Sequence, residues 1–118
     1  MLKALLVAAV AAALIAVPAY AKSSAVMLTG ETGPGYSIDV AKGGKDLKTI
    51  KAGTYKIKVE DKSSIHNFHL FGPGLNKKTS VPFKGDTTWT IKLKPGKYTY
   101  QCDIHVASGM KGTFKVTS

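Results

Sequence analysis

Apolar and polar residues alternate with a period of two in short runs after Ala21, and turns separate these runs. Such alternation places every second side chain on one face of a β-strand. Turns are expected at 33–35, 42–44, 52–53, 84–86 and 95–96, where glycine, often beside proline, ends a run. The buried faces are expected to contain Tyr36, Ile38, Val40, Tyr55, Ile57, Val59, Trp89, Ile91, Leu93, Tyr98, Tyr100, Cys102, Phe114 and Val116. Six or seven short strands with one apolar face each need a second sheet to cover that face, so the sequence predicts an all-β fold, a Greek-key antiparallel β-sandwich.

Two further segments complete this prediction. The run from Ile65 to Phe71 carries bulky residues on both faces. A strand of this kind lies in the interior of a sheet or under a cover, and the long turn at 72–84 is the expected cover. The first strand begins near Val26, and Met27 is expected in the core, as is Trp89.

The first 21 residues have the organisation of a secretory signal peptide. Lys3 precedes an apolar run at 4–17, and the small-x-small triplet at 19–21 follows Pro18. The run is shorter than the roughly 20 residues that a membrane-spanning helix needs. We therefore expect cleavage after Ala21, export to a bacterial periplasm with no stable membrane insertion, and one mature domain over residues 22–118.

The charge pattern excludes several classes of function. All 17 basic residues are lysines, and the formal net charge is +10. An exported chain that lacks arginine and an aromatic platform is not expected to bind nucleic acid. The carboxylates are scattered over turns and polar faces, with no pair spaced for acid/base catalysis and no Ser-His-acid set. We therefore expect no enzymatic activity.

The residues with metal-binding side chains are few. The single cysteine excludes an internal disulfide and zinc sites built on paired cysteines. In an oxidising compartment an unpaired cysteine is expected to be buried, bound to a metal, or both. The candidates are His66, His69, Cys102, His105, Met27 and Met110.

Three of these candidates fall within nine residues, in the order Cys102, His105 and Met110. Cys102 ends a strand with its side chain inward, and the loop at 103–109 can return His105 and Met110 to the same point. His66 lies on a segment that a Greek-key arrangement can place beside the Cys102 strand. His69 is expected to point to the opposite face, as a structural or partly exposed residue.

Two imidazoles and a thiolate with a distant thioether form the blue-copper electron-transfer site. A frame that holds these ligands near a trigonal plane suits both Cu(II) and Cu(I), so that little has to move when an electron arrives. Cu(II) with one thiolate leaves a buried positive charge, whereas Cu(I) with the same thiolate is neutral. Burial therefore favours the reduced form and raises the reduction potential.

The phrase His66-Asn67, followed by Cys102-x2-His105-x4-Met110 after a tyrosine-rich strand, resembles the cupredoxins. The similarity is closest to plastocyanin and pseudoazurin and covers residues from about 52 to 117. It implies one copper ion bound by His66, Cys102, His105 and Met110. It also implies that Asn67 ties the two ligand segments together by hydrogen bonds.

The resemblance implies a small exported type 1 copper protein, a monomer that carries single electrons between redox partners. Two other functions stay open: a periplasmic copper carrier or buffer with no electron-transfer role, and a metal-free β-sandwich interaction module. An apolar patch of Phe71, Pro73, Leu75 and Val106 is expected around the edge of His105. Three lysines are expected to ring it and to steer a redox partner with an acidic docking surface: Lys77, Lys78 and Lys111.

Overall fold

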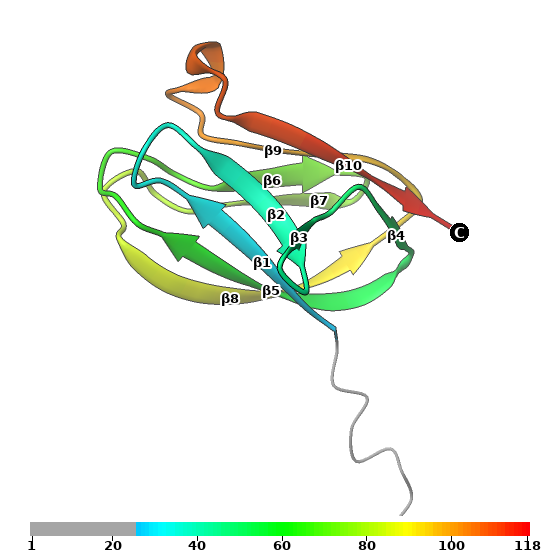
Figure 1. Cartoon of the computed structure of the whole chain (residues 1–118). Coiled ribbons are helices and arrows are strands. Elements are labelled where there is room, and N and C mark those ends of the chain that lie inside the picture. Colours follow the sequence, from blue (N-terminus) through cyan, green and yellow to red (C-terminus); the bar gives the residue numbers. More distant parts are fainter. Residues whose placement is uncertain (1–25) are drawn as a thin grey trace, which may run out of the picture.

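The computed structural model describes residues 26–118, and within them two five-stranded sheets pack face to face (Figure 1). One sheet has the strand order β3-β2-β1-β5-β8 and the other the order β4-β10-β9-β6-β7. This arrangement confirms the predicted β-sandwich. The strands are β1 (Met27–Thr32), β2 (Ile38–Lys42), β3 (Lys45–Asp46), β4 (Thr49–Lys51), β5 (Gly53–Asp61), β6 (His69–Gly72), β7 (Leu75–Lys78), β8 (Gly85–Leu93), β9 (Gly96–Gln101) and β10 (Lys111–Thr117), and the 3-10 turn η2 (Val106–Ser108) lies between β9 and β10.

The predicted signal peptide at 1–21 lies outside the described residues, as do the first four residues of the predicted domain 22–118. Both boundaries therefore stay predictions. Within the part of the chain that the structure describes, no helix has the length and apolar character that crossing a bilayer requires.

The strand directions are mixed. The chain leaves the first sheet after β3, adds β4 to the second sheet, and returns to the first sheet as β5. Because of this crossover, β1 pairs with β5 in parallel, and β4 pairs with β10 in parallel. The other strand pairs are antiparallel, as expected. Alternation along one strand gives no information about the direction of its neighbour, so the sequence could not reveal the two parallel pairs.

The core lies between the sheets and follows the predicted alternation in β5, β8, β9 and β10. Its buried side chains from these strands are Ile57, Val59, Ile91, Leu93, Tyr98, Tyr100, Phe114 and Val116. The rings of Tyr98 and Phe114 stack with centroids 5.4 Å apart. Burying one large apolar side chain contributes about 1.5–3 kcal/mol to stability, so this layer holds the two sheets together.

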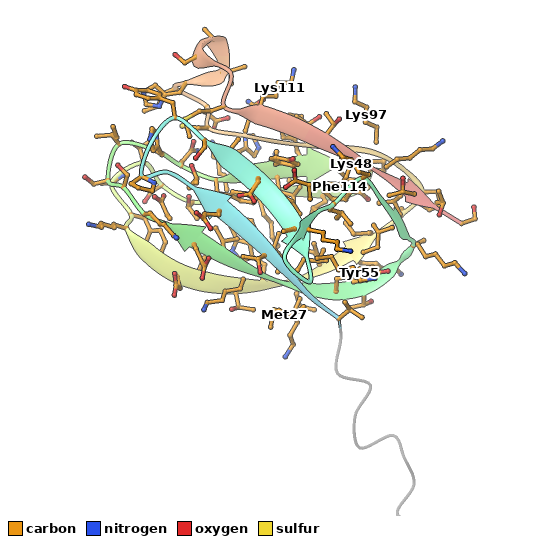
Figure 2. All side chains as sticks on the ribbon, viewed as in Figure 1. Met27, Lys48, Tyr55, Lys97, Lys111 and Phe114 are labelled. Carbon is orange, nitrogen blue, oxygen red and sulfur yellow. The ribbon has the colours of Figure 1, made fainter. Side chains whose placement is uncertain are left out.

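Met27 was expected in the core, but its side chain is 48% exposed (Figure 2). Leu28, Gly30 and Thr32 are the buried positions of β1 and set its phase. Met27 is out of phase with them and faces solvent. On Gly30, a Cβ atom would lie 2.5 Å from Phe68 Cζ, so glycine is the residue that lets this ring pack against the backbone of β1.

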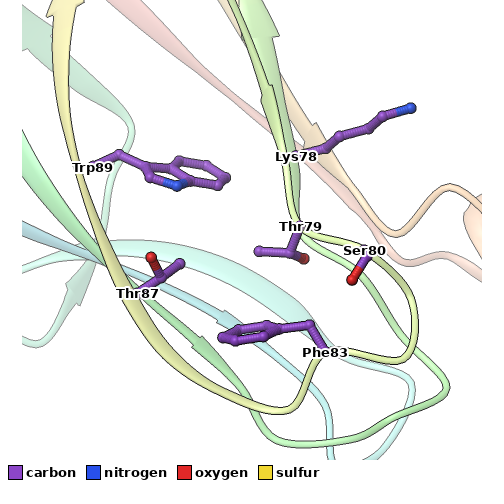
Figure 3. A pocket seen from close by; sticks show the side chains of 6 residues that line it. All are labelled: Lys78, Thr79, Ser80, Phe83, Thr87 and Trp89. Carbon is purple, nitrogen blue, oxygen red and sulfur yellow. The ribbon is translucent and has the colours of Figure 1, made fainter.

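Trp89 has the inward phase of β8 but is only half-buried. Its ring centroid lies 6.1 Å from that of Phe68, and Lys77 Nζ lies 5.9 Å from the indole centroid. A cleft of about 210 Å³ opens beside the indole (Figure 3), and its lining residues are Lys78, Thr79, Ser80, Phe83, Thr87 and Trp89. The core prediction for Trp89 therefore holds for one side of the ring.

The segment 65–71 was expected to be one interior strand, but β6 begins only at His69. Residues before it leave the ladder because their N–H groups bond elsewhere: Asn67 N donates to Cys102 Sγ (3.5 Å) and Phe68 N to Thr79 Oγ1 (2.9 Å). The expected interior position holds for β6, since β7 pairs with it on one edge and lies beside it in the same sheet, where it does not cover a face. On its other side β6 pairs with β9, which places the His66 segment beside Cys102, as predicted.

Candidate metal centre

The loop between β9 and β10 folds back on itself at one end of the sandwich (Figure 1). Cys102 N donates to the Met110 carbonyl (3.1 Å), and His105 N donates to the Cys102 carbonyl (3.1 Å). Met110 N in turn donates to the His105 carbonyl (3.3 Å). Gly109 has φ of 89°, a left-handed conformation that suits glycine and allows the return. These bonds hold three of the predicted ligands in one compact turn.

Three predicted ligand atoms converge at this end of the sandwich. His66 Nδ1 lies 2.9 Å from His105 Nδ1, Cys102 Sγ lies 3.4 Å from His105 Nδ1, and the same sulfur lies 3.8 Å from His66 Nδ1. The point equidistant from these atoms lies about 2 Å from each, close to the roughly 2.0–2.3 Å at which imidazole nitrogen and thiolate sulfur bind a first-row metal ion such as zinc. A thiolate with two imidazoles is also the donor set of a blue-copper plane. The three residues therefore fit copper in both spacing and chemistry.

Met110 and Cys102 are fully buried. Burial agrees with the expectation for an unpaired thiol in an exported protein. Met110 is next to the cluster through its backbone bonds to Cys102 and His105. Its position is compatible with the predicted axial thioether, and that role stays a prediction.

Asn67 joins the two segments that carry the cluster. Its Nδ2 donates to Asp103 Oδ2 (2.9 Å) and to the Thr79 carbonyl (3.3 Å), and its Oδ1 accepts from Asp103 N (2.8 Å). The two bonds with Asp103 span 36 positions of the sequence and link the residue after His66 to the residue after Cys102. The structure therefore has the connection that the resemblance implied for Asn67.

Asp103 is a site residue that the sequence interpretation assigned to a polar turn. Its carboxylate also accepts from Gln101 Nε2 (2.9 Å) and contacts His69 Nδ1 (2.8 Å). Partial burial alone would raise the pKa of the Asp103 carboxyl, but the hydrogen bonds from Gln101, Asn67 and His69 outweigh it and lower the pKa to about 2. The position of this acid directly after Cys102 is the only sequence signal for it.

His69 does not join the cluster. Its Nδ1 contacts Asp103 and its Nε2 lies 2.6 Å from Asn76 Oδ1. Among the described residues, the histidine and cysteine side chains that gather to hold a metal are those of His66, Cys102 and His105. This agrees with the expectation of a structural, partly exposed His69.

Tyr36 is a second residue that the sequence interpretation missed, since it was expected on the buried face of a strand. It lies instead in the loop before β2, 61% exposed, with its ring edge-on to both His66 (5.5 Å between centroids) and His105 (4.9 Å). Gly33 has φ of 74°, and a Cβ there would lie 2.9 Å from His66 Cδ2. Only glycine lets this loop close over the imidazoles, and the Gly-Pro-Gly sequence before Tyr36 is its signal.

The predicted apolar patch is wrong for three of its four residues. Phe71 pairs with Thr99 in the interior of β9, two positions away from the site end, where His69 pairs with Gln101. Pro73 lies farther still, since its carbonyl accepts from Tyr98 Oη (2.8 Å), and Leu75 pairs with Gly72. Strand β6 runs away from the cluster, so the turn at 72–75 lies far from the site end, and only the end of β7 returns to it, where Lys78 pairs with His69.

Exposed apolar side chains do surround the cluster, but they come from other loops. Ile65 and Ile104, each directly before a clustered histidine, are 49% and 55% exposed, and Tyr36 lies over both histidines. Val106, the fourth predicted member, lies in η2 beside His105. We call Tyr36, Ile65, Ile104 and Val106 the site-end apolar surface.

Replacing Asn67 tests the connection between the ligand segments. Asn67→Ala should lower the free energy of unfolding of the metal-free protein by about 2–3 kcal/mol, because three side-chain hydrogen bonds of about 1 kcal/mol each are lost. Urea unfolding followed by Trp89 fluorescence measures this. Gln101→Ala, which removes one exposed bond to the same carboxylate, is the control and should cost less than about 1 kcal/mol. Equal losses in both variants would contradict the role of Asn67.

Solved structures share this fold. Reduced rusticyanin superimposes with a TM-score of 0.56 at 21% identity, over 77% of this chain and 78% of that chain. Rusticyanin from Thiobacillus ferrooxidans gives 0.50 at 23% identity, over 77% and 76%. Dithionite-reduced auracyanin from Roseiflexus castenholzii gives 0.54 at 19% identity, over 80% and 98%. No curated protein matches the chain significantly.

The sequence itself matches a family over most of its length. Residues 20–117 match the copper-binding proteins of the plastocyanin/azurin family. This range contains both sheets and the whole cluster, and it agrees with the resemblance found in the motifs. The chain therefore belongs to the plastocyanin/azurin family of copper-binding proteins, the cupredoxins, and copper is its cofactor.

Proposed function

We propose that the chain is an exported, monomeric one-electron carrier that binds one copper ion through His66, Cys102, His105 and Met110. The observation that carries the proposal is the convergence of two imidazole nitrogens and one thiol sulfur within 3.8 Å of one another. Copper, when bound, supplies the one-electron couple. The rest of the function belongs to the chain, which holds the donors and limits access to them.

The cluster is built to move little. Cys102 and His105 lie in a turn closed by backbone hydrogen bonds, and Asn67 ties the His66 segment to that turn. Donors held in this way serve two oxidation states with little rearrangement, which is what rapid electron transfer requires. The N–H of Asn67 also points at Cys102 Sγ (3.5 Å) and stabilises negative charge on the sulfur.

The same features argue against an enzyme. His66 and Cys102 are completely buried, and so is Met110, the proposed fourth ligand. Four protein donors leave no open coordination position for a substrate, in contrast to catalytic metal sites. The proposal therefore gives the chain no reaction beyond taking up and releasing an electron.

His105 is the proposed exit for the electron, because it is the half-buried member of the cluster and borders the site-end apolar surface. An apolar surface allows a redox partner to approach closely. Two exposed lysines lie at the same end: Lys78 pairs with His69, and Lys111 opens β10 (Figure 2). They support a partner with an acidic docking surface. Lys77, which was expected beside them, lies over Trp89 instead.

Copper titration tests the proposed ligands. Adding Cu(II) to the 22–118 protein should produce an intense blue or green absorption, which Cys102→Ser should abolish because the thiolate is lost. Cyclic voltammetry should then show a reversible one-electron wave. Fast loss of Cu(I) to a mild chelator without such a wave would favour a copper carrier, and no colour at all would refute copper binding by this cluster.

Charge reversal tests the docking surface. Hexacyanoferrate(III) is an anion and oxidises the reduced protein. In Lys78→Glu/Lys111→Glu the rate of this oxidation should be about three- to ten-fold lower at low ionic strength than in the parent protein. The parent rate should fall as salt is added, and the rate of the variant should not. Stopped-flow absorption measures the rate. The control, Lys97→Glu/Lys115→Glu, reverses two lysines that pair at the other end of the sheet and should change the rate less. Equal effects of the two pairs would mean that only net charge matters.

Removing the phenol ring tests whether Tyr36 shields the histidines. Capture of Cu(I) by bathocuproine disulfonate should be about ten-fold faster in Tyr36→Ala, since two edge-on aromatic contacts of about 0.5–1.5 kcal/mol each are lost. Tyr36→Phe keeps the ring and should behave like the parent protein. If the alanine variant releases copper no faster, the ring does not protect the cluster.

A further inference from the structure

Three buried side-chain atoms in residues 26–118 have no hydrogen-bond partner: Thr32 Oγ1, Asp61 Oδ2 and His66 Nε2. Their residues are at most 2% exposed. An unsatisfied buried polar atom costs about 1–3 kcal/mol, so buried polar groups in native proteins nearly always have partners. Three such atoms therefore point to missing partners.

Thr32 and Asp61 lie side by side. They are the last residues of β1 and β5, and they face each other in the parallel register of these strands. Both continue the inward phase of their strands, after Gly30 in β1 and Val59 in β5. Both side chains therefore enter the interior at the end of the sandwich where the ligand loops meet.

The Nε2 edge of His66 faces the same place. A Cβ on Gly33, the residue after Thr32, would lie 2.9 Å from His66 Cδ2 and 3.7 Å from Nε2. Ser63 N donates to Asp61 Oδ1 (3.1 Å), which leaves Oδ2 free. Burial raises the pKa of the Asp61 carboxyl, and the nearby His66 imidazole opposes this rise.

We propose that Asp61, together with Thr32, is a positioning residue for His66, and that one water bound between Asp61 Oδ2, Thr32 Oγ1 and His66 Nε2 connects the three. A buried water is stable when it has two to four polar partners, and these atoms supply three. None of the three bonds another directly. A single bridging molecule satisfies them all.

The connection sets the tautomer of His66. With Nε2 as the donor toward the carboxylate side, the lone pair stays on Nδ1, which is the atom that lies 3.8 Å from Cys102 Sγ. A metal-binding histidine commonly gives its other N–H to a carboxylate or a water, which fixes the ring and makes it a better ligand. Asp61 would accept this N–H from His66 through the water. Asp103 does not have this role, because its carboxylate contacts His69.

The first test uses the metal-free protein. Long-range ¹H–¹⁵N spectra should show His66 in the Nε2–H tautomer, and Asp61→Leu should convert it partly or wholly to Nδ1–H. Asp61→Asn keeps an acceptor and the shape of the side chain, so it should retain most of the parent tautomer. Asp39→Asn is the matched control, since Asp39 is a half-buried carboxyl of the same sheet in β2, and it should change nothing.

The second test measures copper affinity by chelator competition. Asp61→Leu should weaken binding about 10–100-fold, the usual effect of losing a partner behind a ligand, with a smaller loss in Thr32→Val and Asp61→Asn and none in Asp39→Asn. A change in the visible spectrum of the copper protein should accompany the loss. If Asp61→Leu does not fold, as judged by urea unfolding, Asp61→Asn and Thr32→Val provide the same comparison.

An Nδ1–H tautomer in the parent protein, or unchanged tautomer and affinity in Asp61→Leu and Thr32→Val, would overturn the inference. The inference rests on the proposed role of His66 as a copper ligand, but the two can fail separately. A parent protein that shows the Nε2–H tautomer, with the expected response to Asp61→Leu, and yet binds no copper would refute the proposed function and leave the role of Asp61 intact.

Discussion

The metal centre depends on a connection between two loops that are far apart in the sequence. His66 and Cys102 are 36 positions apart in the sequence, yet His66 Nδ1 and Cys102 Sγ must come close enough to bind the same ion, and they lie 3.8 Å apart. The bonds between Asn67 and Asp103 hold the loops together with protein atoms alone. The donors are therefore placed before any ion arrives, so binding does not have to supply the free energy of ordering both loops.

The sandwich makes this connection possible. Pairing of β6 with β9 fixes the register at which the His66 loop meets the Cys102 turn. Beneath it, Tyr98 of β9 stacks on Phe114 of β10 and ties these two strands together. The backbone also contributes directly, because strand β6 starts late and frees the N–H of Asn67 for the sulfur of Cys102. A regular strand over 65–71 would have used that N–H in the sheet. The site thus requires a local loss of ladder pairing.

The parts of the structure that the sequence predicted are those set by period and chemistry. Alternation located most core positions, and the rarity of sulfur and imidazole side chains singled out the cluster. The failures concern phase and loops. Met27 is one residue out of phase with Leu28, and Tyr36 lies over the histidines because Gly33 adopts a left-handed conformation. Such features depend on tertiary contacts, which a single strand or turn pattern does not contain.

The two histidines of the cluster have opposite surroundings, and this asymmetry suits a carrier. His66 is sealed in the interior, and we propose Asp61 and Thr32 as the partners of its far nitrogen. His105 is half-buried and borders exposed apolar side chains. A ring held from behind can fix the position of the ion, while a ring at the surface can bring it within reach of a partner. Tyr36 contacts both rings, so the same loop that separates His66 from bulk solvent also shapes the surface through which we propose that His105 meets a partner.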